Sequence, residues 1–190
     1  MEHPVIGFAM CGSFCTFDKV LSQLEQLRNT YPNIIPILSE VSRNTDNRFG
    51  DADAFAQRMQ SICDRPILSS LTAVEPIGPK QLLDALVIAP CTGNTIAKLA
   101  GGIADSAVTL AAKAHLRNDA PVILAISTND GLGGNAANIG RLLARKHFYF
   151  VPFGQDDPVH KPCSLVADFS RLSDTISMAL EGRQIQPILL

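Results

Sequence analysis

Short, continuous apolar runs recur along the chain, and longer stretches of mixed character separate them. A strand that is buried on both faces shows such a run instead of an alternation of apolar and polar residues. The runs therefore predict strands over residues 5–10, 34–38, 85–89, 122–126 and 148–151. Pro36 lies inside the second run, and proline is tolerated chiefly at the edges or bulges of sheets. A strand over residues 34–38 is therefore compatible only with such a position.

The stretches between these runs carry apolar residues at helical spacing. The first series extends from Phe17 to Leu27 and follows Thr16, a residue type that caps helices. The same spacing predicts helices that include residues 55–62, 96–100, 105–116, 137–146 and 165–180. The polar segment 39–50 is expected to be a loop.

The alternation of strands and helices predicts an α/β fold with a doubly wound, Rossmann-like parallel sheet between two layers of helices. No repeat, low-complexity tract or linker divides the sequence, so residues 1–190 are expected to form one domain. In such folds ligands bind beyond the carboxyl ends of the strands, where the strand order reverses. Candidate site residues are therefore sought after the first four strands.

The composition excludes several classes of protein. Hydrophobic residues make up 46% of the chain and charged residues 18%, which is not the composition of a disordered protein. The net charge of −2 gives no basic excess for nucleic acid binding. No apolar run approaches the roughly 20 residues that span a bilayer, and the start of the chain does not resemble a secretory signal. A cytoplasmic protein that binds neither nucleic acid nor membrane is expected.

The cysteines do not predict a disulfide framework or a metal site. Their number is odd, and Cys11 and Cys15 are not followed by a second pair at zinc-finger spacing. No metal ion is therefore expected.

Small polar residues follow the first two predicted strands. Gly12 and Ser13 can present backbone N–H groups and a hydroxyl to an anion at the start of a helix, although the same pair also suits a tight turn. Ser39 is open to the same two interpretations, as an anion ligand or as a helix cap. The spacing is not that of the GxGxxG dinucleotide fingerprint.

The segment 90–95 follows the third strand and is the most informative. It offers the hydroxyls of Thr92 and Thr95 and the amide of Asn94 at the expected ligand edge. An amide both donates and accepts hydrogen bonds, so Asn94 suits the polar edge of a ligand or a carboxylate. The alternative is that Asn94 caps the following helix. Ser127 and Asn129 end the fourth strand at the same edge.

Residues 89–95 (Ala-Pro-Cys-Thr-Gly-Asn-Thr), 97–100 and 102–105 resemble the signature of the FMN-binding, cysteine decarboxylase-like flavoproteins. Asn129 matches the asparagine of the family's Pro-x-Met-Asn motif, but Leu132 and Gly133 stand where Met-Trp follows it. Pro76 stands where the decarboxylases carry their catalytic histidine. The resemblance therefore does not extend to the complete catalytic set of a cysteine decarboxylase.

The resemblance implies that residues 1–190 form a single flavoprotein-type domain. It also implies FMN, with its phosphate near the first two strands and its ring near the 90–95 segment. It also implies a homo-oligomer, a trimer or dodecamer, with flavin near the contacts between copies. The catalytic residues that it implies are Asn94 and Asn129. The cofactor-binding residues that it implies are Gly12, Ser13, Phe14, Ser39, Pro90, Cys91, Thr92, Asn94, Thr95 and Ser127.

Five further segments, 44–50, 75–80, 126–131, 151–158 and 186–190, resemble one branch of these flavoproteins across the whole chain. That branch implies a different partner chain carrying NADP, a small dicarboxylate substrate that is oxidised to an aromatic ring, and the mother-cell cytoplasm of a sporulating bacterium. The alternatives are a flavin-binding or assembly protein without catalysis of its own, and an FMN-dependent decarboxylase of another carboxylate.

A dicarboxylate substrate needs at least one cationic partner, and arginine is the better bidentate donor. Arg48, in the loop after the second strand, is the first candidate, and Lys98 is the second. Arg48 is also compatible with a solvated loop residue or with an ion pair between copies of the chain.

Overall fold

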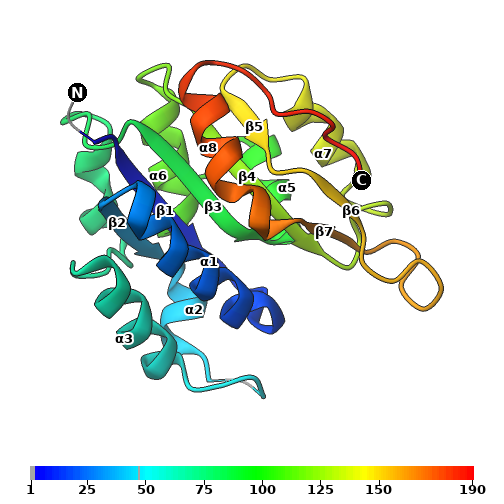
Figure 1. The fold of residues 1–190 in the computed structure, drawn as a ribbon, viewed down its shortest axis with the longest axis horizontal. Coiled ribbons are helices and arrows are strands. Elements are labelled where there is room, and N and C mark those ends of the chain that lie inside the picture. The colour runs from blue at the N-terminus through cyan, green and yellow to red at the C-terminus, as the bar shows by residue number, and fades with distance from the viewer. Residues whose placement is uncertain (1–2, 47) are drawn as a thin grey trace.

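The computed structural model describes residues 3–46 and 48–190, and its strands form a single seven-stranded sheet (Figure 1). Five parallel strands are arranged in the order β2-β1-β3-β4-β5. They are β1 (Val5–Met10), β2 (Asn33–Leu38), β3 (Ala85–Cys91), β4 (Val122–Thr128) and β5 (Phe148–Phe150). All five predicted strands are thus confirmed, and Pro36 lies in β2, at one edge of the sheet.

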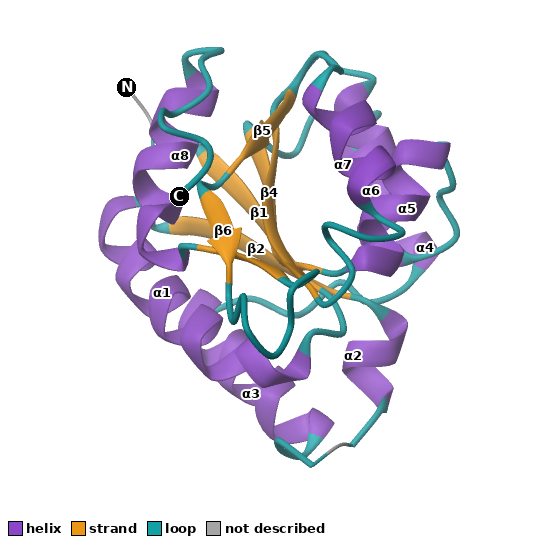
Figure 2. Ribbon diagram, turned by 90° about the vertical axis from the view of Figure 1, so that its right-hand side faces the viewer, coloured by secondary structure: helices purple, strands orange, loops and turns teal. Residues whose placement is uncertain are grey.

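Helices cover both faces of the sheet, as the alternating pattern predicted (Figure 2). One face carries α1 (Phe17–Thr30), α3 (Ala52–Cys63) and α8 (Leu172–Leu180). The other carries α4 (Leu71–Val74), α5 (Gly93–Gly101), α6 (Ala107–Leu116) and α7 (Ala136–Leu143). The segment expected to be a loop contains a short helix, α2 (Glu40–Asn44), and three 3₁₀ turns complete the fold: η1 (Phe14–Thr16), η2 (Glu75–Ile77) and η3 (Phe169–Arg171). No helix in residues 3–46 and 48–190 is long and apolar enough to cross a membrane.

The predicted helix over residues 165–180 is wrong in its first part. Residues Leu165–Ala167 form strand β7, which pairs antiparallel with β6 (Phe153–Gln155) and with the end of β4. Leu165 and Ala167 are buried and Val166 only partly so, which is the alternation of a strand. The Asp168 side chain accepts a hydrogen bond from Ser170 N at 3.0 Å and so begins η3, from which α8 continues. The sheet is therefore mixed, although its main part is parallel.

Strand β4 divides its outer edge between two partners. Its first half, Val122 to Leu124, pairs with β5, and its last residues, Ser127 and Thr128, pair with β7. The β6–β7 hairpin, drawn in orange at the right of Figure 1, therefore stands beside the carboxyl end of β4. This hairpin forms a wall next to the edge where ligands are expected.

Each outer strand of the sheet has further hydrogen-bond partners. Beside β2, Leu38 N donates to Leu68 O at 3.0 Å and Leu68 N donates to Pro36 O at 2.9 Å. Beside β5, the Gln184 side-chain amide accepts from Phe150 N and donates to Phe150 O, both at 2.7 Å. Beside β6, Phe153 exchanges backbone hydrogen bonds of 3.0 Å with residues 188 and 190 near the C-terminus. The backbone at residue 68, the Gln184 side chain and the C-terminal segment thus form hydrogen bonds with the outer edges of β2, β5 and β6, respectively.

Candidate functional site

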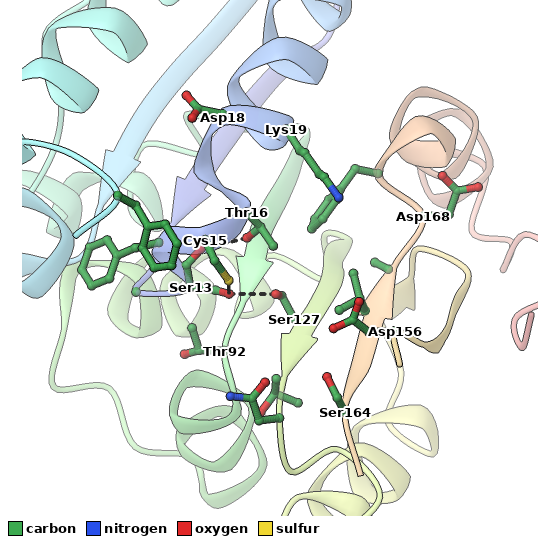
Figure 3. Close-up of a pocket in the computed structure, with 18 of the residues that line it drawn as sticks. Ser13, Cys15, Thr16, Asp18, Lys19, Thr92, Ser127, Asp156, Ser164 and Asp168 are labelled. Atoms are coloured by element: carbon green, nitrogen blue, oxygen red, sulfur yellow. Dashed lines mark hydrogen bonds between the residues drawn. The ribbon is translucent and has the colours of Figure 1, made fainter. Parts of the chain in front are cut away.

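A cleft of about 1200 Å³ opens at the carboxyl ends of β1 and β3 (Figure 3). The strand order β2-β1-β3 reverses between these two strands, and the turns that leave them diverge there. The cleft is bounded by the turn after β1, the start of α1, the start of α5, the end of β4 and the β6–β7 hairpin. The predicted ligand edge therefore carries a real cavity.

The turn after β1 places a serine hydroxyl at the floor of the cleft. Ser13 N donates to Cys11 O at 2.7 Å and Thr16 Oγ1 donates to Ser13 O at 2.8 Å, so the turn is held from both sides. Ser13 Oγ lies 2.8 Å from Ser127 Oγ, which joins this turn to the end of β4 (Figure 3). Phe14 opens the 3₁₀ turn η1, and the first N–H groups of a helical turn have no partner within it. A Cβ at Gly12 would meet only Phe14, at 3.9 Å, so the backbone there is open to a ligand.

The turn after β3 brings the start of α5 to the cleft. Thr92 is the N-cap of α5, and its Oγ1 accepts a hydrogen bond from Thr95 N at 3.3 Å. Gly93 follows and packs against a polar cluster centred on the Asp130 carboxylate. Thr128 Oγ1 donates to Asp130 Oδ1 at 2.5 Å, and Asn135 Nδ2 donates to Asp130 Oδ2 at 2.8 Å. This cluster fixes the turn that follows β4.

Behind the cleft, Cys11, Cys91 and Thr95 form a buried group. Cys11 Sγ donates to Pro90 O at 3.0 Å and accepts from Thr95 Oγ1 at 3.2 Å. Burial raises the pKa of the Cys11 thiol, and the hydrogen bonds from Thr95 and Thr92 offset only part of that shift. Burial, and then the neighbouring Cys11, raise the pKa of the Cys91 thiol well above its ordinary value. Both thiols are therefore protonated at neutral pH and are packing groups rather than nucleophiles.

We expect only two of the five cysteines to react with a thiol reagent in the folded protein. Cys15 and Cys163 are exposed, whereas Cys11, Cys63 and Cys91 are buried. Burial raises the pKa of Cys63 to about 12, so its thiolate is scarce as well as shielded. Titration with Ellman's reagent at pH 8 should give two fast equivalents in buffer and five in denaturant. Mass spectrometry that located early labelling on Cys91 would contradict the packing role.

The cleft contains three cationic side chains. Lys19 extends from α1 toward the interior of the cleft (Figure 3), and it forms no ion pair with any residue that the structure describes. Arg48 lines the outer part, with its guanidinium carbon 4.8 Å from the centre of the Phe49 ring. Lys161 belongs to the β6–β7 hairpin and lies 3.4 Å from an Asp156 carboxylate oxygen. Lys19 is therefore a cation available to an anionic ligand.

The structure divides the predicted site residues into two groups. Six of the predicted flavin or catalytic residues and one predicted substrate residue line the cleft: Gly12, Ser13, Phe14, Thr92, Ser127, Asn129 and Arg48. The others lie outside its lining: Ser39, Pro90, Cys91, Asn94, Thr95 and Lys98.

The residues outside the lining have other surroundings. Pro90 and Cys91 are buried in β3, and Ser39 caps α2 by accepting a hydrogen bond from Ser42 N at 3.2 Å. Asn94 is exposed on the first turn of α5, and Lys98 pairs with Asp105 at 2.8 Å. The hydrogen bond from Lys98 lowers the pKa of the Asp105 carboxyl. Because Thr92 is the cap of this helix, the alternative capping role considered for Asn94 is wrong.

Sequence reasoning missed part of the cleft. Lys19 follows from the polar face of a correctly predicted helix, so its position was available from the pattern. Asp156, Lys161 and Ser164 lie on or beside the hairpin whose second strand was assigned to a helix, so no signal led to them. No histidine was predicted to belong to the site, and none lines the cleft in the described part of the chain.

The fold is a doubly wound α/β fold with a ligand-sized cleft at its switch point, and comparison with known proteins identifies the family. The Flavoprotein family model matches residues 1–150, so the chain belongs to this family. The sequence is 44% identical over 185 residues to the B subunit of dipicolinate synthase from Bacillus subtilis (strain 168), covering 97% of this chain and 92% of that protein.

Solved structures give the same picture. The crystal structure of the dipicolinate synthase B subunit from Bacillus halodurans is 45% identical with a TM-score of 0.90, covering 98% of this chain and 96% of that one. The FMN-dependent cysteine decarboxylase SpaF is 21% identical with a TM-score of 0.70, covering 93% of this chain and 97% of that one. The FMN-binding protein AtHal3 is 18% identical with a TM-score of 0.67, covering 97% of this chain and 100% of that one. These last two similarities show the fold, which is the predicted doubly wound flavoprotein type.

Proposed function

We propose that this chain is the flavin-binding B subunit of a dipicolinate synthase and works with the separate A subunit of that enzyme. The observation that carries the proposal is the 44% identity to the Bacillus subtilis protein of that name over nearly the full length of both chains. The proposed reaction is the oxidation of a dihydrodipicolinate to dipicolinate during sporulation, in the mother-cell cytoplasm. NADP is assigned to the A subunit.

FMN fits the cleft of this chain. The open backbone at Gly12 and the hydroxyls of Ser13, Thr92 and Ser127 form a polar end suited to a phosphate and a ribityl chain, and Phe14 supplies an aromatic wall. The extended glycine fingerprint that holds a pyrophosphate is missing, which favours FMN over FAD. When bound, FMN would supply an acceptor for the hydride that the substrate ring loses.

The remaining work falls to the chain's own residues. Oxidation removes a hydride, which FMN would accept, and a proton, which would pass to water in the open cleft, and the product gains aromatic stabilisation. Lys19 and Arg48 are proposed to bind the two substrate carboxylates from the cleft. Asn129, exposed at the rim, is proposed to orient the substrate through its amide.

In this proposal, Asn94 and Lys98 contact the ligand bound by a second copy of the chain in a homo-oligomer. Both lie on α5, outside the lining of their own cleft, and Asn94 is exposed. They can reach a ligand only if a second copy brings its cleft against α5. The proposed assembly is therefore one in which two copies complete each site.

The test is reconstitution of dipicolinate formation from the purified chain and the A subunit, with the chain, FMN and NADP omitted in turn. We expect formation to need the chain and to fall by at least about tenfold when FMN is removed, since the flavin would be the hydride acceptor. An equal rate from the A subunit alone would overturn the proposal. An unchanged rate without FMN, but not without the chain, would reduce the chain to an assembly role. Release of carbon dioxide in step with product would instead indicate a decarboxylase.

A further inference from the structure

A second cavity, of about 270 Å³, lies on the α5–α6–α7 side of the sheet. It is bounded by the C-terminal end of α5, by α6, by the segment after α7 and by the start of β5. Its lining residues are Leu99, Gly102, Ile103, Thr109, Lys113, Leu116, Arg117, Arg145 and Phe148. In the described part of the chain, none of them also lines the large cleft.

The walls of this cavity are apolar. Leu99 and Phe148 are almost completely buried, and Leu116 is partly buried. Ile103 lies beside Gly102, where α5 ends, and remains 51% exposed. An apolar group of a ligand that entered this cavity would bury the exposed side chain of Ile103.

Three cations surround the apolar walls. Lys113, Arg117 and Arg145 take part in none of the ion pairs found within residues 3–46 and 48–190. This grouping is local, because the whole chain has a net charge of −2. Lys113 and Arg117 are four residues apart at the end of α6, a spacing at which like charges repel by about 0.2–0.5 kcal/mol.

Arg145 is already held in position. Its Nη1 donates to Leu99 O at 3.1 Å, and its guanidinium carbon lies 5.3 Å from the centre of the Phe148 ring. A guanidinium has five N–H donors, so most of them remain for another acceptor. A cation that is fixed in advance loses little conformational entropy when an anion binds.

A structural role explains only part of this arrangement. Cations near a helix C-terminus interact favourably with its dipole, which accounts for Lys113 and Arg117. The hydrogen bond from Arg145 to Leu99 O likewise satisfies a carbonyl in the last turn of α5. The apolar cavity between the three cations has no such structural role.

We propose that this cavity is a second binding site, separate from the flavin cleft, for a small aromatic carboxylate. The apolar walls would take a single ring, and Arg145, Lys113 and Arg117 would pair with one or two carboxylates. The cavity is too small for a flavin and of the size of one substituted ring. The inference does not depend on the proposed reaction.

The probe is isophthalate, a benzene ring with two carboxylates, titrated into the full chain at low ionic strength. The readout is the δ1-methyl NMR signal of Ile103, assigned with Ile103→Val, because this methyl lies at the cavity and senses a ring nearby. We expect a saturable shift, an affinity at least about tenfold weaker in Arg145→Gln, and an affinity a few-fold weaker in Lys113→Gln. Lys113 is exposed, so its variant keeps the test valid should Arg145→Gln fail to fold.

Two matched controls separate this site from its surroundings. Arg141→Gln removes a cation that lines neither cavity, and Lys19→Gln removes one from the cleft; both should leave the Ile103 titration unchanged. Unchanged affinity in both Arg145→Gln and Lys113→Gln would overturn the proposal. A competing effect of inorganic phosphate as strong as that of isophthalate would overturn the role of the ring. No titration, with altered sedimentation of Arg145→Gln, would show instead an interface between copies of the chain.

Discussion

Replacing Gly93 with alanine is expected to lower the free energy of unfolding by about 2–3 kcal/mol. A Cβ at this position would lie 2.6 Å from both Asn135 Nδ2 and Thr128 Oγ1, and 2.7 Å from Asp130 Oδ1. Thr128 and Asn135 are the two side chains that donate to the Asp130 carboxylate, so they cannot move away without losing those bonds. The cluster and the start of α5 would be forced apart. Urea denaturation followed by circular dichroism measures the change.

Gly140 provides a control of opposite sign. It also lies in a helix, and a Cβ there would have no atom within 4 Å. Alanine loses less conformational entropy than glycine in a helix, so Gly140→Ala should stabilise the protein by about 0.5–1 kcal/mol. Equal effects of the two substitutions would show that the polar cluster does not constrain position 93.

The second large effect is expected at the flavin site. Ser13→Ala should weaken FMN binding by about 1–3 kcal/mol, because it removes a hydroxyl that lines the cleft and leaves the Ser127 hydroxyl without this partner. Quenching of flavin fluorescence on titration gives the dissociation constant. An unchanged constant would remove Ser13 from the proposed site.

Ser39→Ala is the matched comparison for Ser13→Ala. Ser39 was predicted to bind the same phosphate, but its hydroxyl lies outside the cleft lining and caps α2. If capping is its main role, the substitution lowers stability by about 1 kcal/mol and leaves FMN affinity near the wild-type value. A larger loss of affinity than that of Ser13→Ala would restore Ser39 to the phosphate site.

Sequence reasoning predicted the parallel core of the fold because its strands are buried on both faces. Residues 85–91 are buried throughout, so the apolar run has only one interpretation at its length. The β6–β7 hairpin was missed for the opposite reason. Its strands have three residues each, too few to show an alternation, and Leu165 stands at helical spacing before Phe169 and Leu172. The apolar residues of the short strand β7 thus continue the helical spacing of α8, and together they resemble one longer helix.

The residues of the candidate site were predictable where a polar residue directly follows a predicted strand. Ser13, Thr92, Ser127 and Asn129 follow strands directly, and all four line the cleft. Asn94 and Lys98 are on the first turns of a helix, where rotation by one residue changes the direction of a side chain by about 100°. The pattern around residue 93 does not set that rotation. The Thr92 cap does, and only the structure shows which threonine or asparagine caps the helix.

The covered borders of the sheet limit how this protein can associate with others. Unpaired strand edges are the usual template for adding a strand from another chain, whether in a functional complex or in an aggregate. Here the backbone of Leu68, the side chain of Gln184 and the C-terminal residues already bond part of each outer edge, at residues 36, 38, 150 and 153. A different protein or a second copy is therefore expected to dock on helices or loops. Complexes of this chain should accordingly be disrupted by substitutions on helix surfaces and should tolerate changes along β2, β5 and β6 that leave the fold intact.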